Sequence, residues 1–151
     1  MLFLSSKKAT FIGALALSLS TGVNALWTCG SDQHVFPVDT SKFLVHFTRW
    51  SDSHYEDKTP WIRICLPNDD GTWTDVEPLG LNCAPKGQTF TPKQTKLKAN
   101  LKVVGGQGCT GSENSGLNGA SITYKDQKIN LQHGGDACGP RNHGITCQFK
   151  K

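Results

Sequence analysis

The chain has 151 residues, with 16 Lys and Arg against 12 Asp and Glu, so its formal net charge is +4. This length is that of one domain with a packed core. Two of the surplus lysines lie among the first residues, and the remaining charge of +2 does not by itself predict a nucleic-acid or membrane partner.

The first 25 residues have the order of a secretory signal peptide. Lys7 and Lys8 form a basic region, and an apolar run of about a dozen residues follows from Ala9 to Leu19. This run is shorter than the roughly 20 residues that a membrane-spanning helix needs. Small residues then precede a cleavage site after Ala25. We therefore predict a secreted, extracellular chain in which residues 26–151 form a single domain.

The first half of the mature chain is typical of short strands separated by turns. From Phe43 to Arg49, apolar side chains recur at every second position, which predicts a strand with one buried face. Trp61 to Leu66 is rich in aromatic and β-branched residues and predicts a second strand. Asn68 to Gly71 is a turn signal, from which Thr72 to Val76 can return as a third strand.

The clearest alternation runs from Lys96 to Val104. Its apolar positions are Leu97, Ala99, Leu101 and Val103. The intervening positions include Lys96, Lys98 and Lys102. In a helix these residues would scatter around the axis, so the pattern predicts a strand with one dry face and a row of lysines toward water.

The second half continues in the same way. Gly105 to Gly119 is a glycine-rich loop, and Ala120 to Tyr124 with Lys128 to Gln132 predicts a β-hairpin. Ile145 to Phe149 predicts a last strand, and no stretch has the pattern and caps of an amphipathic helix. The predicted fold is all-β, a small disulfide-stabilised sandwich or barrel of about six to eight strands with long loops.

Six cysteines lie in the mature part, an even number that predicts disulfides in an oxidising compartment. They are Cys29, Cys65, Cys83, Cys109, Cys138 and Cys147. Six cysteines allow fifteen pairings. The working hypothesis joins Cys29 with Cys147, Cys65 with Cys83, and Cys109 with Cys138. None of the short spacings used by zinc sites is present.

Catalytic and cofactor motifs are absent from the sequence. The zinc-protease, nucleophile-elbow and P-loop patterns do not occur. The acids between Asp69 and Glu77 lack the spacing of a calcium loop. The sequence therefore predicts no metal and no cofactor, and it favours a protein that is not an enzyme.

Charge is divided unevenly along the chain. Between Ala84 and Gly108 there are five lysines and no acid, whereas seven acids lie between Asp52 and Glu77. This division predicts one basic and one acidic side, with Lys96, Lys98 and Lys102 as candidate binding residues for phosphates or anionic glycans. The alternative is that these lysines form a solvated outer face that protects a sheet edge.

Four tryptophans lie in the first half of the mature chain: Trp27, Trp50, Trp61 and Trp73. A buried tryptophan would fill the core. An exposed one would offer a stacking surface for a sugar or an anchor for a protein partner.

The stretch from Leu26 to Gln33 resembles the mature start of fungal ribotoxins, which are secreted ribonucleases. The resemblance implies a pairing of the first cysteine with one near the C-terminus, and a catalytic Glu between two histidines and an arginine. Here the corresponding set would be His46, Glu77, Arg141 and His143. No strand motif surrounds them as in those enzymes, so the resemblance implies a catalytically inactive relative. In size, export signal and cysteine content, the chain is also similar to small cysteine-rich secreted effectors of plant-associated fungi.

Three functions follow as hypotheses. The first is a monomeric effector or toxin-like protein with a role in virulence, which binds a host or competitor protein without catalysis. The second is a secreted ribonuclease or RNA-binding protein, with His46, Glu77, Arg141 and His143 around one cleft. The third is a carbohydrate or cell-wall binding domain with a row of exposed tryptophans.

Overall fold

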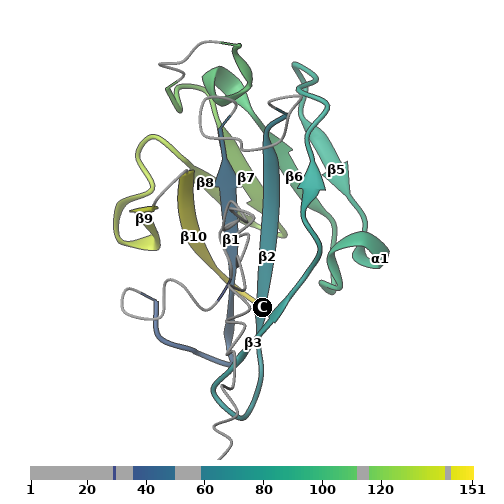
Figure 1. The fold of residues 1–151 in the computed structure, drawn as a ribbon, viewed down its shortest axis with the longest axis vertical. Coiled ribbons are helices and arrows are strands. Elements are labelled where there is room, and N and C mark those ends of the chain that lie inside the picture. The colour runs from purple at the N-terminus through teal and green to yellow at the C-terminus, as the bar shows by residue number, and fades with distance from the viewer. Residues whose placement is uncertain (1–28, 30–35, 50–58, 112–115, 142–143) are drawn as a thin grey trace, which may run out of the picture.

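A computed structural model describes residues 29, 36–49, 59–111, 116–141 and 144–151 (Figure 1). The predicted signal peptide lies outside the described residues. Ten strands are present in the described part: β1 (Lys42–Thr48), β2 (Trp61–Pro67), β3 (Trp73–Asp75), β4 (Leu79–Gly80), β5 (Gln88–Phe90), β6 (Leu101–Val104), β7 (Ser121–Tyr124), β8 (Gln127–Asn130), β9 (Cys138–Arg141) and β10 (Gly144–Lys150). Between β1 and β10, the helical segments of the described residues are α1 (Pro92–Thr95) and the 3-10 turns η3 (Gly106–Cys109) and η4 (Gly135–Ala137).

The strands form two antiparallel sheets, which confirms the all-β prediction. Sheet A has six strands in the order β3-β2-β1-β10-β9, with β4 also paired to β2. Sheet B has four strands in the order β5-β6-β7-β8. The chain builds most of sheet A, then all of sheet B, and returns with β9 and β10 to complete sheet A beside β1 (Figure 1).

The core lies between the inner faces of the two sheets. Phe43, Val45 and Phe47 alternate along β1 and are wholly buried, as the sequence predicts. Phe43 joins the sheets: its ring stacks on Phe149 of sheet A at 5.5 Å and meets the edge of Tyr124 of sheet B at 4.9 Å. Aromatic pairs at these separations stabilise a core beyond the area that they bury.

The outer face of sheet A is buried as well. Leu44, Trp61 and Cys65 point to this side and form a second apolar cluster with Cys29 and Phe36 from the N-terminal part of the chain. Five consecutive residues of β1 from Phe43 to Phe47 are therefore buried, including those that the alternation assigns to a polar side.

The predicted strand from Lys96 to Val104 is only partly confirmed, because the strand β6 begins at Leu101. Before it, α1 makes a single turn with Pro92 at its start and ends at Lys96 in a left-handed conformation (φ 58°). One turn is too short to produce a helical period, so the sequence pattern did not reveal it. The alternation itself is correct: Leu97 and Leu101 are buried, whereas the lysines between and beside them are exposed.

The other predicted strands are confirmed, but the described part has ten strands rather than the predicted six to eight, because the short strands β4, β5 and β9 were not predicted from the sequence. β7 and β8 form the expected hairpin, and β10 is the expected last strand. Within the glycine-rich loop, the backbone at Gly106 lies close to the backbone at Ala120. A Cβ at Gly106 would lie 2.4 Å from the backbone nitrogen of Ala120, and the φ of Gly106 is +51°. Only glycine meets both conditions there without strain.

The predicted disulfide pairing is wrong. The structure joins Cys29 to Cys65, Cys83 to Cys109, and Cys138 to Cys147, and no described cysteine is free. Register explains the last pair, because Cys138 on β9 lies directly opposite Cys147 on β10. The first pair ties the N-terminal part to β2, and the second ties the chain before β5 to η3.

Peptide mapping without reduction should recover these three pairs.

We expect the double substitution Cys83→Ala and Cys109→Ala to lower the free energy of unfolding by about 3.5 kcal/mol, because the disulfide closes a loop of 26 residues. Urea unfolding of the wild type and the variant measures this difference. A peptide joining Cys29 to Cys147, or a variant as stable as the wild type, would contradict this assignment.

Asp39 precedes β1 and gives a pH dependence that can be tested. The Ser41 hydroxyl and N–H donate to its carboxylate at 2.6 and 2.9 Å, and the Lys42 ammonium lies 3.1 Å away; together they lower the pKa of Asp39 from 3.8 to about 2. A pKa depressed by folding contributes stability at higher pH, which is lost as the pH falls from 3.8 to about 2.

We expect Asp39→Asn to be less stable than the wild type at neutral pH, and this difference to shrink through that acidic window. Urea unfolding at a series of pH values measures it. A difference that stayed constant down to about pH 2 would show that the Asp39 carboxylate does not gain these bonds on folding.

Candidate binding site

Three lysines are the predicted binding residues, and all three are exposed. Lys96 and Lys98 follow α1 and line a pocket at one end of the sandwich. Lys102 lies in β6, on the outer face of sheet B. The structure therefore divides the predicted set between two locations, a pocket and a sheet face.

The chain around the first two lysines is held by a buried threonine. The Thr95 hydroxyl donates to the carbonyl of Thr91 at 3.0 Å and accepts the N–H of Leu97 at 3.2 Å. Leu97 is thereby turned into the core, where it is 7% exposed. Because its neighbours Lys96 and Lys98 are exposed, both cations stand at the surface beside this buried leucine.

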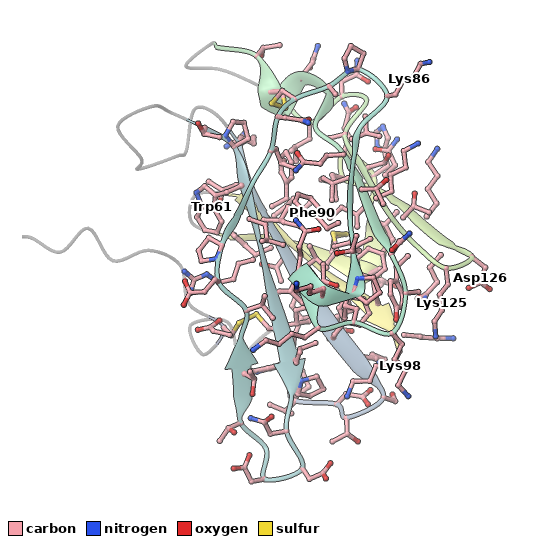
Figure 2. All side chains as sticks on the ribbon, turned by 90° about the vertical axis from the view of Figure 1, so that its right-hand side faces the viewer. Trp61, Lys86, Phe90, Lys98, Lys125 and Asp126 are labelled. Carbon is pink, nitrogen blue, oxygen red and sulfur yellow. A yellow bond between two sulfur atoms is a disulfide. The ribbon has the colours of Figure 1, made fainter. Side chains whose placement is uncertain are left out.

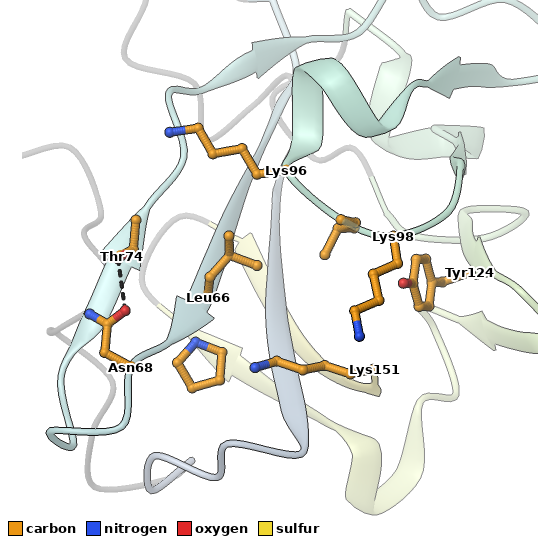
Figure 3. A pocket seen from close by; sticks show the side chains of 9 residues that line it. Leu66, Asn68, Thr74, Lys96, Lys98, Tyr124 and Lys151 are labelled. Carbon is orange, nitrogen blue, oxygen red and sulfur yellow. Dashed lines mark hydrogen bonds between the residues drawn. The ribbon is translucent and has the colours of Figure 1, made fainter.

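The pocket has a volume of about 320 Å³ and opens where β2, β7 and β10 end. It is lined by Leu66, Pro67, Asn68, Thr74, Lys96, Leu97, Lys98, Tyr124 and Lys151. Figure 3 shows the lysines around the opening, with Leu66 on one side and the Tyr124 ring on the other. The pocket thus combines an apolar wall from both sheets with a cationic rim.

Within the described residues, Lys96, Lys98 and Lys151 form no ion pair with an acid. Two other polar lining groups are already engaged: the Thr74 hydroxyl donates to Asn68 Oδ1 at 3.0 Å, and the Asn68 side-chain N–H donates to the Thr72 hydroxyl. The nearby Asp70 carboxylate accepts hydrogen bonds from Thr72, which lower its pKa, and it does not line the pocket. The lysines of the rim are therefore not directly paired with an acidic side chain of the described residues.

The outer face of sheet B carries a row of alternating lysines and threonines. Register places Thr89, Lys102, Thr123 and Lys128 side by side across β5, β6, β7 and β8. Both lysines of this row are exposed. They are two strands apart, which corresponds to a total distance of roughly 10 Å between their backbones. Figure 2 shows Lys86, Lys98 and Lys125 on the side of the molecule opposite to Trp61, together with Asp126.

A second pocket, of about 400 Å³, lies between the edge of sheet B and β10. Lys42, Lys128 and Lys150 contribute to its lining together with Asp136. Lys42 is also paired with Asp39 at 3.1 Å. In this pocket, unlike the first, acidic side chains therefore offset part of the positive charge of the lysines.

His46 does not point to water as the alternation suggests. It is wholly buried on the outer face of sheet A, with its Nδ1 2.8 Å from the Thr146 hydroxyl and its ring 5.6 Å from the Trp61 ring. A Cβ at Gly144 would lie 3.0 Å from His46 Nε2 and 2.1 Å from the Phe47 carbonyl oxygen, so only glycine fits beside it. This packing is that of a structural histidine.

Arg63 lies opposite His46 on β2 and is also nearly buried. Its Nη1 is 3.5 Å from an Asp75 carboxylate oxygen, and its guanidinium carbon is 5.9 Å from the centre of the Trp61 ring. The other Asp75 oxygen accepts the Cys29 N–H at 3.2 Å. Arg63 and Asp75 thus connect the polar row of sheet A to the N-terminal part of the chain.

Cys29, Cys65 and Asp75 offer ligand atoms within 4.8 Å of one another. Both sulfur atoms are already joined in a disulfide, so this group is not a metal site.

His46 and Glu77, the two residues of the ribonuclease-like set whose side chains are described, lie in different surroundings. Glu77 is exposed between β3 and β4, whereas His46 is buried. Arg141 ends β9, and its backbone pairs with Gly144; its side chain and the whole of His143 lie outside the described residues. The arrangement of the full set around one cleft remains a prediction.

Neither tryptophan in the described part is exposed. Trp61 is 2% exposed and Trp73 is half-buried, while Trp27 and Trp50 lie outside the described residues. Sequence reasoning missed Leu66, Tyr124 and Lys151 as lining residues of the pocket, because they meet only through long-range strand pairing.

The sequence matches no model of a protein family, and no curated protein or solved structure matches it significantly. Within the described part of the chain, no helix is long and apolar enough to cross a membrane.

The structural role of His46 can be tested by substituting its partner. Thr146→Val keeps the shape of the side chain but removes the hydroxyl beside His46 Nδ1 at a wholly buried position. We expect the free energy of unfolding to fall by about 1–3 kcal/mol. Thr110→Val is the control, because this exposed hydroxyl bonds only to the Gln107 carbonyl and its loss should cost less than about 0.5 kcal/mol. Equal effects of the two substitutions would contradict the role given to His46.

Proposed function

We propose that this chain is a secreted effector or toxin-like protein that acts without catalysis, by binding an acidic surface of a host or competitor protein. The observation that carries the proposal is the row formed in order by Thr89, Lys102, Thr123 and Lys128 on the outer face of sheet B. A flat sheet face with fixed cations and hydroxyl groups suits a protein surface that presents carboxylates.

The rigidity of this face supports the choice. Leu101 and Val103 flank Lys102 along β6 and are both buried in the core, so the backbone that carries the lysine is fixed. Ile122 does the same next to Thr123 on β7. A preorganised face loses less conformational entropy on binding than a mobile loop does.

Three disulfides and two packed sheets support action outside the cell. Such cross-links persist where the environment is oxidising, which agrees with the predicted signal peptide. They also stabilise the domain by restricting the unfolded chain.

A ribonuclease is the alternative that involves His46. In its favour, the backbone of Arg141 pairs with Gly144, the residue that approaches His46 Nε2. Against it, a general acid or base must reach its substrate, and His46 is wholly buried. The burial of His46 therefore favours binding over RNA cleavage. Purified protein should leave RNA intact, and cleavage lost on His143→Ala would support the ribonuclease instead.

The binding role can be tested on plant leaf tissue, the host suggested by the similarity to fungal effectors. We expect purified residues 26–151 to produce a cell response such as ion leakage. Lys102→Glu with Lys128→Glu should raise the dose for half-maximal response at least about ten-fold, because each reversal replaces an attraction by a repulsion.

The matched control is Lys86→Glu with Lys93→Glu, which changes the net charge equally at two exposed positions outside the row and outside the pocket that Lys128 lines. This control should keep the wild-type dose. No response to the wild type, or an equal loss in both variants, would contradict the proposal.

A further inference from the structure

We infer that the pocket at the end of the sandwich binds a small organic anion with a compact apolar body, such as an aromatic carboxylate. This binding is distinct from the protein docking proposed above, because Lys102 and Lys128 do not line the pocket.

The wall of the pocket suits an apolar body. Leu66 comes from the end of β2 in sheet A, whereas Leu97 and Tyr124 belong to the layer of sheet B. Leu97 is 7% and Tyr124 1% exposed, so their positions are fixed by the core. A volume of about 320 Å³ is close to the lower bound of about 300 Å³ for ligand pockets, which favours a small ligand.

The rim of the pocket suits an anion. Lys96, Lys98 and Lys151 reach it from two segments that are distant in sequence (Figure 3). No ion pair within the described residues neutralises them, and the amide of Asn68 is already engaged with threonines of the same turn. A carboxylate bound between the ammonium groups of Lys98 and Lys151 would supply the missing negative charge, while its apolar body rests on the wall formed by Leu66, Leu97 and Tyr124.

Lys96 has a left-handed backbone conformation, which lysine rarely adopts. Its φ of 58° lies in the left-handed region where glycine or asparagine usually ends a helix. A residue whose backbone is held in a sparsely populated conformation often marks a functional position. Here the left-handed turn places a cation at the rim and turns the next residue, Leu97, into the wall.

The test uses 2-naphthoate as the probe. Its binding to residues 26–151 is measured by calorimetry and by the changes in the NMR shifts of Tyr124 and Leu97. We expect a dissociation constant of roughly 10 μM to 1 mM, as for other small ligands with one charged group. The neutral analogue 2-naphthylmethanol and inorganic sulfate should each bind at least about ten-fold more weakly, because one lacks the charge and the other the apolar body.

Two sets of variants locate the site. Lys98→Gln with Lys151→Gln should weaken naphthoate binding at least about ten-fold, whereas Lys86→Gln with Lys150→Gln, which removes the same charge outside this pocket, should leave it unchanged. Lys96→Gly should weaken binding while the melting temperature stays the same or rises, because glycine relieves the left-handed backbone. This last variant separates loss of the ligand group from loss of the fold.

The inference would be overturned by equal binding of sulfate, by equal binding of the neutral analogue, by equal effects of both lysine pairs, or by no binding at about 10 mM probe. The failure of this inference is distinguishable from the failure of the proposed function, because the proposed function is tested by the tissue response to variants of Lys102 and Lys128.

Discussion

The packing of Phe43 between Phe149 and Tyr124 is the interaction on which the rest of the structure depends. Phe43 and Phe149 belong to adjacent strands of sheet A, and Tyr124 ends β7 of sheet B, so this one cluster fixes the two sheets against each other. Tyr124 also lines the pocket at the end of the sandwich. Its contact with Phe43 therefore couples the core to the wall of the candidate site, and the pocket exists only when both sheets are packed.

The two outer faces of the sandwich have different roles. On sheet A, polar and apolar side chains alike are buried, and Thr146, His46 and Arg63 lie side by side across β10, β1 and β2. On sheet B, the lysines remain exposed. In this buried row the Thr146 hydroxyl lies beside His46 and Arg63 is paired with Asp75, whereas the exposed lysines of sheet B are available to a partner. We therefore propose a structural role for the outer face of sheet A and recognition for the outer face of sheet B.

The sequence predicts the local features well and the long-range ones poorly. Alternation in a strand depends on neighbours two positions apart, so Phe43 to Phe47 and the inward direction of Leu97 and Leu101 follow from the pattern alone. The burial of His46 does not, because alternation gives the face of a residue but not what covers that face. The disulfide pairs depend on register, as for Cys138 opposite Cys147, and spacing cannot supply it. The pocket likewise requires Leu66 and Tyr124, which are distant in sequence.

The central claim of this account is that Lys96, Lys98 and Lys151 surround a preformed binding pocket, while the buried histidine serves the fold. A crystal structure of residues 26–151 with bound 2-naphthoate tests it most directly. The account predicts a carboxylate between Lys98 and Lys151, a naphthyl ring against Leu97 and Tyr124, and His46 still buried beside Thr146. A collapsed or empty pocket, or naphthoate bound beside an exposed His46, would contradict it.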